Sequence, residues 1–102
     1  MIHVIATVEL VPGKREPFLN AFRANVPNVL AEDGCIEYGP AIDVATDIGA
    51  QIPFRENVVT VVEKWRDLAA LKAHLAAPHM LAYRTQVKDL VARVSLQILQ
   101  PA

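Results

Sequence analysis

Residues 58–79, VVTVVEKWRDLAALKAHLAAPH, change from the pattern of a strand to that of a helix and decide the fold. Four valines and a threonine open the stretch, and branched side chains of this kind favour an extended strand. We expect this strand to end at Trp65. Asp67 follows, and its carboxylate can accept hydrogen bonds from the free amides of a helical first turn. The stretch therefore predicts a strand at 58–65 followed directly by a helix.

The helix after Asp67 is predicted to bury a stripe of leucines, which are Leu68, Leu71 and Leu75. Pro78 suits the first position of another helix. Its ring fixes the backbone φ at a helical value, and the N–H that proline lacks would have no acceptor within the helix at this position. That helix is expected to turn four side chains inward: Met80, Tyr83, Val87 and Leu90.

The remaining elements flank this stretch on both sides. Residues 2–11 alternate apolar side chains on one face, which predicts a strand, and apolar spacing predicts a helix from about Glu16 to Leu30. Pro27 is expected to kink that helix, because it removes a backbone donor. Two further strands are predicted at 35–44 and 94–98, and a long loop at 45–57. This order predicts a ferredoxin-like α+β sandwich, in which one antiparallel four-stranded sheet carries helices on one face.

Composition limits the classes of protein to consider. The 102 residues are expected to form one domain, 1–102, since 53% of them are hydrophobic and only 21% charged. With a net charge of −1 and no basic run, nothing favours nucleic acid or an anionic membrane as partner. The single cysteine, Cys35, excludes an intrachain disulfide. Because the stretch MIHVIATVELVPG lacks a basic region before an apolar core, we expect a cytoplasmic protein without a signal peptide.

A small domain with an open sheet face has reason to pair with a second copy. A chain of this length buries only about two-thirds of its unfolded surface. The face away from the helices is predicted to carry Ile5, Thr7, Glu9, Ser95 and Gln97, a mixture too apolar to lie comfortably in water. We therefore expect a homodimer that covers this face.

Two motifs resemble the antibiotic biosynthesis monooxygenase family, a group of dimeric α+β barrel proteins. They are Gly34-Cys35-x-x-Tyr38, at the turn into the second strand, and Glu63-x-Trp65-x-Asp67 followed by Leu71-x-x-His74 and Pro78-His79. The resemblance implies a homodimer with a pocket between helices and sheet, and oxidation of phenols or hydroquinones by molecular oxygen without a bound cofactor. Since the family also contains isomerases, haem degraders and members of no established activity, the resemblance alone does not decide the reaction.

The haem-degrading branch can be compared residue by residue. Its members carry an Asn on the first strand, a Trp in the helix after the third strand and a haem-ligating His about one helix further on. The resemblance puts these positions at or near Ala6, His74 and Arg84, and none of the three side chains fits. Haem degradation is therefore not expected.

Oxygenation without a cofactor needs a substrate that becomes electron-rich, and deprotonation of a phenol or hydroquinone achieves this. The site then needs a base, a water-poor cavity and donors for the resulting oxyanion. His74 flanks the leucine stripe and is expected at the border between core and cavity. His79 follows Pro78 in a first helical turn, where the helix dipole disfavours a charged ring. Both are candidate catalytic bases, with His74 preferred for the pocket.

Four more side chains are predicted to bind substrate: Trp65, Tyr38, Glu63 and Tyr83. Glu63 and Trp65 leave the same face of their strand, because strand side chains alternate with period two. Packing alone would also account for Trp65 and Tyr38. Glu63 is expected to pair with an Arg or Lys or to face the dimer interface.

The sequence thus predicts a cofactor-independent monooxygenase that oxidises a small phenolic or hydroquinone compound with O2. No metal is expected, because His74 and His79 lack the i, i+4 spacing of zinc ligands on one helix. No cofactor is expected either, since phosphate-binding and dinucleotide-binding fingerprints are absent. Two alternatives stay open: a non-catalytic dimer that binds a small ligand or serves in stress, and an isomerase of a small oxygenated metabolite.

Overall fold

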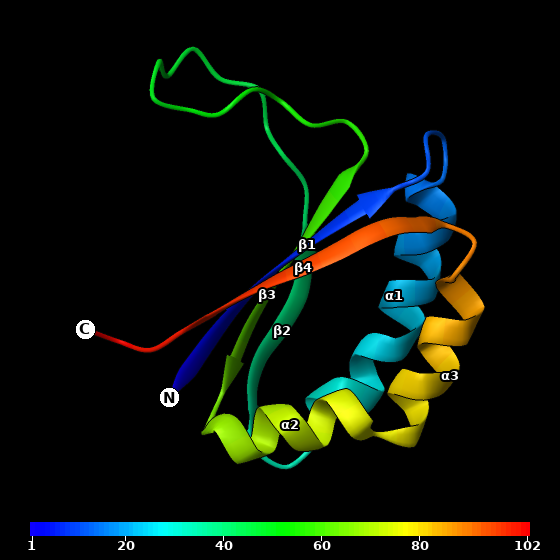
Figure 1. Cartoon of the computed structure of the whole chain (residues 1–102), viewed down its shortest axis with the longest axis vertical. Coiled ribbons are helices and arrows are strands. Elements are labelled where there is room, and N and C mark those ends of the chain that lie inside the picture. The colour runs from blue at the N-terminus through cyan, green and yellow to red at the C-terminus, as the bar shows by residue number, and fades with distance from the viewer.

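A computed structural model describes residues 1–102 and contains one antiparallel sheet with three helices on one face (Figure 1). The elements in chain order are β1 (Ile2–Leu10), α1 (Arg15–Leu30), β2 (Cys35–Ala41), β3 (Val58–Trp65), α2 (Leu68–Ala76), α3 (Pro78–Val87) and β4 (Val91–Leu99). The strand order β2-β3-β1-β4 places the first and last strands side by side. The predicted α+β ferredoxin-like fold is confirmed.

The central stretch has the boundaries that its pattern predicts. β3 covers Val58–Trp65, and Asp67 caps α2 by accepting a hydrogen bond from the backbone N–H of Ala70 at 2.8 Å. Pro78 is the first residue of α3. One member of the predicted leucine stripe is wrong: Leu68 is the first residue of α2 and is 45% exposed, whereas Leu71 is fully buried.

The alternation along β1 sets the face that meets the helices. Val4, Ala6, Val8 and Leu10 are buried, and Val4 pairs with Glu63 across the ladder to β3. On the opposite face, Ile5 and Thr7 lie beside Gln97 and Ser95 of β4, as the alternation predicts. None of the three helices is long and apolar enough to cross a membrane.

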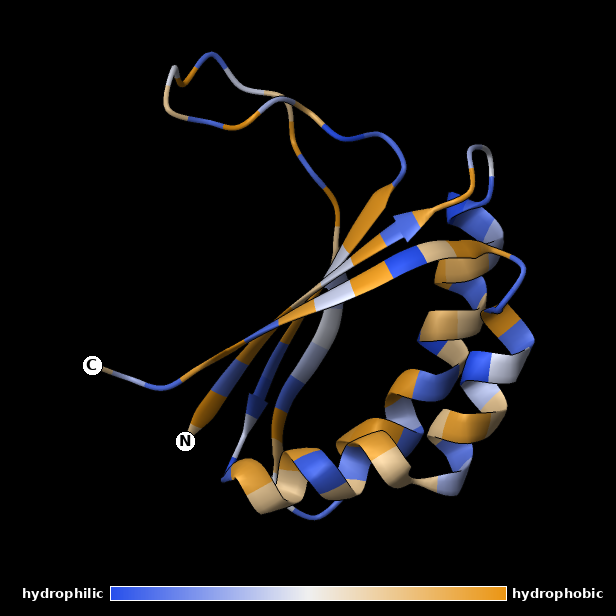
Figure 2. Ribbon diagram, in the orientation of Figure 1, coloured by the Kyte–Doolittle hydropathy of each residue, from blue (hydrophilic) through white to orange (hydrophobic).

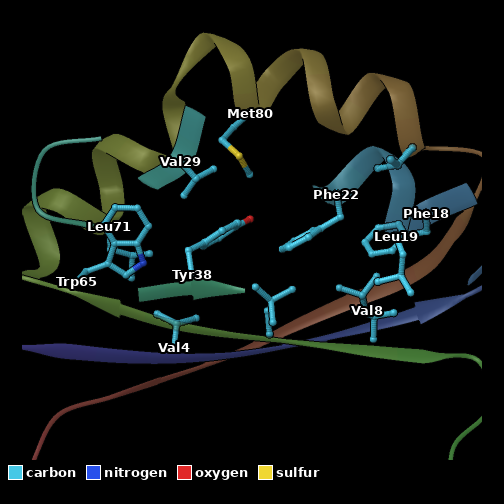
Figure 3. Close-up of a cluster of buried hydrophobic side chains, with 14 of the residues drawn as sticks. Val4, Val8, Phe18, Leu19, Phe22, Val29, Tyr38, Trp65, Leu71 and Met80 are labelled. Carbon is cyan, nitrogen blue, oxygen red and sulfur yellow. The ribbon is translucent and has the colours of Figure 1, made fainter. Parts of the chain in front are cut away.

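Aromatic side chains fill the space between α1 and the sheet (Figure 3). The rings of Phe22 and Tyr38 stack with centroids 5.2 Å apart, and Phe18 packs on Phe22 at 6.0 Å. Trp65 is completely buried at the end of β3, beside Leu71 of α2. Burial of these large rings supplies much of the hydrophobic stabilisation that a domain of this size can gather.

The loop between β2 and β3, residues 42–57, stands out from the body as an arm (Figure 1). Arg55 donates to the carboxylate of Asp43 through its backbone N–H and its guanidinium, each at 3.0 Å, and Gln51 donates to the carbonyl of Val44 at 2.6 Å. Five large apolar side chains of the arm are nevertheless exposed (Figure 2): Ile42, Val44, Ile48, Ile52 and Phe54. The arm is therefore held in shape by its own polar contacts while its apolar side chains have no cover.

Gly34 is required where the chain turns from α1 into β2. Its φ is +85°, and a Cβ at this position would lie 2.6 Å from the Cβ of Ala70. Gly13 has nearly the same φ, +82°, but open space around it. We expect Gly13→Ala to cost about 1 kcal/mol of backbone strain and Gly34→Ala about 1–3 kcal/mol more, because α2 must also move. Urea unfolding of both variants measures the difference, and equal losses would contradict the close approach of α2.

Candidate functional site

A cavity of about 420 Å³ lies between the sheet and the helices, within the size range of small-molecule sites. Thirteen of its 17 lining residues are hydrophobic. Ala6 and Val61 form its floor, while α1 contributes Phe18 and Phe22. The remaining lining residues are polar: Glu63, His74, Arg84 and Lys88. Because this lining is mostly apolar, electrostatic interactions of the few polar groups in it are stronger than they would be in water.

The flank of the cavity beside β4 is the least covered. Val94 and Leu96 line it, yet both side chains are about half exposed. Arg84 and Lys88, from α3 and the turn after it, also line the cavity and make no ion pair within the chain. The cavity is therefore most open between α3 and β4.

Glu63 brings a carboxylate into this apolar space. Its side chain points to the helix side of β3, is 6% exposed, and accepts a hydrogen bond from Nε1 of Trp65 at 2.9 Å. Burial raises the pKa of Glu63 from 4.5 to about 7, against the lowering effect of the Trp65 N–H and with added repulsion from Glu32. The expected pairing of Glu63 with an Arg or Lys is wrong, because its partner within the chain is the Trp65 indole. The pairing with Trp65 follows from the shared strand face.

The raised pKa of Glu63 predicts how the stability of the fold depends on pH. Between about pH 4.5 and 7 the folded chain holds a proton on Glu63 that the unfolded chain has lost, so this group destabilises the fold increasingly as pH rises through that window. A difference of 2.5 pKa units (7 − 4.5) corresponds to about 3 kcal/mol. We therefore expect Glu63→Gln to be more stable than wild type by about 2–3 kcal/mol at pH 8 and equal to it near pH 4.5.

Denaturant unfolding across this pH range measures the difference between the two proteins. Glu37→Gln, on the exposed face of β2 and paired only with Lys64, is the matched control and should show no comparable trend. A stability difference independent of pH would show that the Glu63 carboxylate is ionised in the folded chain throughout.

His74 supplies the second acid–base group of the cavity. Its side chain is 2% exposed, and its ring packs on Trp65 and Tyr38 with centroids 4.6 and 5.4 Å apart. Nδ1 lies 2.9 Å from Oε2 of Glu32. Nε2 forms no hydrogen bond within the chain. Since every fully buried side-chain nitrogen or oxygen has a partner, Nε2 is not fully buried and remains accessible beside the cavity that His74 lines.

The protonation state of His74 suits a base. Burial lowers the pKa of His74 below its usual 6.5, and the charges of Arg84 and His79 act in the same direction, while Glu32 partly offsets them. The ring is therefore neutral near pH 7 and able to accept a proton. His74 thus lies at the border between core and cavity, as expected.

His79 lies elsewhere. Its side chain is 29% exposed and absent from the cavity lining, and its Nε2 lies 2.9 Å from Oε2 of Glu32. The same carboxylate oxygen therefore contacts both imidazoles. The sequence gives no local signal for Glu32, because it lies in the turn after α1, outside the predicted helix and strands.

Of the predicted substrate-binding residues, Tyr38 and Tyr83 line the cavity and Trp65 does not. Burial raises the pKa of both tyrosines, so their hydroxyl groups stay protonated and can donate. In Figure 3 the hydroxyl of Tyr38 lies on the side of Met80, below α3. Trp65 is fully buried and acts on the cavity through its bond to Glu63. No group of three or more His, Cys, Asp or Glu side chains is placed to hold a metal ion.

Comparisons with known proteins agree on one family. Residues 1–86 match the family model described as antibiotic biosynthesis monooxygenase. The chain is 40% identical to the "Probable quinol monooxygenase YgiN" of Escherichia coli K12, over 99% of this chain and 98% of that protein.

Solved structures share the architecture. PA3566 from Pseudomonas aeruginosa superposes with a TM-score of 0.81 at 28% identity, covering 99% of this chain and 93% of that one. Rv0793 from Mycobacterium tuberculosis gives a TM-score of 0.78 at 29% identity, covering 99% and 94% of the two chains.

Proposed function

Because this chain belongs to the antibiotic biosynthesis monooxygenase family, we propose that it oxidises a small phenol or hydroquinone with O2, without a bound cofactor. One observation carries the proposal: the same apolar cavity is lined by the neutral imidazole of His74 and by the carboxyl group of Glu63, whose pKa is raised to about 7. The Escherichia coli relative is named a probable quinol monooxygenase, which supports a quinol as the substrate.

The reaction starts with removal of a proton from an aromatic hydroxyl. Nε2 of His74 accepts this proton, and the phenolate that forms is electron-rich enough to pass electrons to O2. The Tyr38 hydroxyl donates to the oxyanion, in a cavity where few waters compete. Glu63, half protonated near pH 7, accepts from a second hydroxyl of the substrate and returns a proton to the reduced oxygen.

The products follow from the balance of atoms and electrons. A hydroquinone and O2 become a hydroxyquinone and one water molecule. One oxygen atom forms a new bond to a ring carbon, and the other leaves as water with two hydrogens taken from the substrate. The four-electron reduction of O2 is thus supplied entirely by the substrate, and no external reductant is needed.

Oxygen uptake with a panel of benzo- and naphthohydroquinones tests the function. We expect consumption above the rate of autoxidation, with ¹⁸O from labelled O2 in the quinone product and an equal amount in water. Product formation under strictly anaerobic conditions would instead show an isomerase. Thermal stabilisation by aromatic compounds without oxygen use would show a binding protein, because ligand binding alone raises stability.

We also propose that the active form is a homodimer in which the arm 42–57 docks on a second copy. This arrangement would bury the five exposed apolar side chains of the arm against the half-exposed stripe Val94, Leu96 and Ile98 of β4. That stripe lies on the helix side of the sheet, so the proposed contact differs from the expected cover of the opposite face. Since Val94 and Leu96 line the cavity, an arm from the partner would also close its open flank. A domain of about 100 residues gains considerable stability from such cover.

Disrupting the arm should separate the subunits. We expect wild type to be a dimer by light scattering at micromolar concentration, and the double variant Ile52→Asp, Phe54→Asp to be a folded monomer, since each charge would lie in an apolar contact. Asp47→Ala, an exposed polar position of the same arm, is the control and should remain dimeric. A wild-type monomer, or a dimeric double variant, would refute docking by the arm.

A further inference from the structure

We infer that Glu32 is the positioning residue of the site: it holds His74 with the Nε2 lone pair toward the cavity, and His79 in turn holds Glu32. The role of His74 as base rests on the proposed function, whereas the orientation and tautomer of its ring do not.

The turn that carries Glu32 is itself well defined. Glu32 lies between α1 and β2, where its backbone N–H donates to Val29 at 3.0 Å and its carbonyl accepts from Cys35 at 3.2 Å. The side chain is only 13% exposed and reaches under the junction of α2 and α3. There its Oε2 lies 2.9 Å from Nδ1 of His74 and 2.9 Å from Nε2 of His79. One carboxylate oxygen therefore joins the end of one helix to the start of the next.

The chemistry of a carboxylate decides which ring nitrogens carry protons. An ionised carboxylate only accepts hydrogen bonds, so Nδ1 of His74 and Nε2 of His79 must both be N–H donors. A neutral His74 then has no proton on Nε2, which is the nitrogen open to the cavity. The contact with Glu32 thus presents the lone pair, rather than an N–H, to an incoming hydroxyl.

The same contact stabilises His74 after it has accepted a proton. The titratable or charged groups around this ring are Glu32 in the turn, Tyr38 on β2, and Arg84 and His79 on α3. Only Glu32 among them favours the imidazolium, since Arg84 and His79 disfavour it and Tyr38 stays neutral. Charge-assisted hydrogen bonds of this kind are roughly twice as strong as neutral ones.

His79 explains why the carboxylate stays in place. Glu32 would otherwise be a long side chain with a single hydrogen-bonded contact, free to turn toward solvent at the edge of the domain. A second N–H donor on the same oxygen removes that freedom, in the way that outer partners orient a ligand or a base. His79 therefore acts through Glu32 rather than on substrate.

Nitrogen-detected NMR of the histidine rings tests this without any substrate. In wild type at neutral pH we expect His74 to carry its proton on Nδ1. Glu32→Ala should leave a mixture of tautomers, and Glu32→Asp should restore much of the wild-type signal. Asp33→Asn removes a neighbouring carboxylate that pairs only with Arg66, and should leave the His74 ring unchanged. A wild-type proton on Nε2, or identical ring signals in Glu32→Ala, would overturn the inference.

Kinetics give a second readout that a merely structural role would not move. Glu32→Gln removes the charge that raises the pKa of His74, so the ascending limb of kcat/KM against pH should shift to lower pH. Its plateau should fall by about 10–100-fold, the usual cost of losing an orienting partner. Thermal unfolding in parallel shows that the variant is folded, and an unshifted pH profile in a folded variant would count against Glu32.

The two proposals fail in different ways. Absence of oxygen uptake in wild type, with the tautomer change still seen in Glu32→Ala, would remove the proposed reaction and leave the role of Glu32 intact. Normal oxygen uptake in wild type, with no tautomer change in Glu32→Ala, would support the proposed reaction and remove the role of Glu32.

Discussion

Replacing His74 with glutamine should lower kcat/KM for hydroquinone oxidation by about 10²–10⁴-fold, the range that a positioned general base contributes. Glutamine can still donate an N–H to Glu32, so the carboxylate keeps a partner and the fold should be preserved. The side chain loses the basic nitrogen that faces the cavity. Because the lost interaction forms only as the proton moves, most of the fall should be in kcat rather than KM.

The comparison with other histidines makes this prediction specific. His3→Gln should leave the rate unchanged, since His3 lies on β1 opposite Lys64, on the sheet face away from the cavity. His79→Gln should reduce the rate less than His74→Gln, because His79 reaches the base only through Glu32. Oxygen uptake at saturating and limiting hydroquinone measures all three. A His74→Gln variant with a wild-type rate would remove His74 from the reaction.

Replacing Trp65 with alanine should lower the free energy of unfolding by about 3–5 kcal/mol, the typical cost of deleting a buried indole. The side chain is fully buried, packs on His74 at 4.6 Å and donates its N–H to Glu63 at 2.9 Å. Alanine would leave a cavity and take the only donor from a buried carboxyl group. Since small domains are stable by only about 5–15 kcal/mol, this loss is a large fraction of the total stability.

Trp65→Phe separates packing from hydrogen bonding. Phenylalanine fills most of the space, so this variant should be clearly more stable than Trp65→Ala. It nevertheless lacks the N–H that lowers the pKa of Glu63, and that pKa should therefore rise above about 7. Urea unfolding of the three proteins at pH 5 and pH 8 measures both effects. Loss of less than about 1 kcal/mol in Trp65→Ala would show that the indole is not part of the core.

The fold was predictable because its signals are local. Alternation along residues 58–65, the cap at Asp67 and the proline at 78 lie in one short stretch, and each acts on its immediate neighbours. The bond between Glu63 and Trp65 was also within reach of the sequence, since residues two apart on a strand share a face. It was missed because a surface ion pair is the commoner partner of a glutamate.

The arrangement around Glu32 could not be predicted in this way. The hydrogen bonds to His74 and His79 join residues 42 and 47 positions apart, and they depend on how α2 and α3 meet the turn after α1. No periodic pattern encodes that junction. For the same reason, the helix dipoles alone favoured His79 as the base, although only His74 lines the cavity.

The absorption spectrum of a bound hydroquinone, recorded without oxygen at pH 7, tests most directly whether this cavity removes a proton from an aromatic hydroxyl. With wild-type protein in excess over a naphthohydroquinone, we predict the red-shifted band of the phenolate, reduced in His74→Gln and unchanged in His3→Gln. A bound ligand that shows only the spectrum of the neutral hydroquinone in wild type would contradict the account.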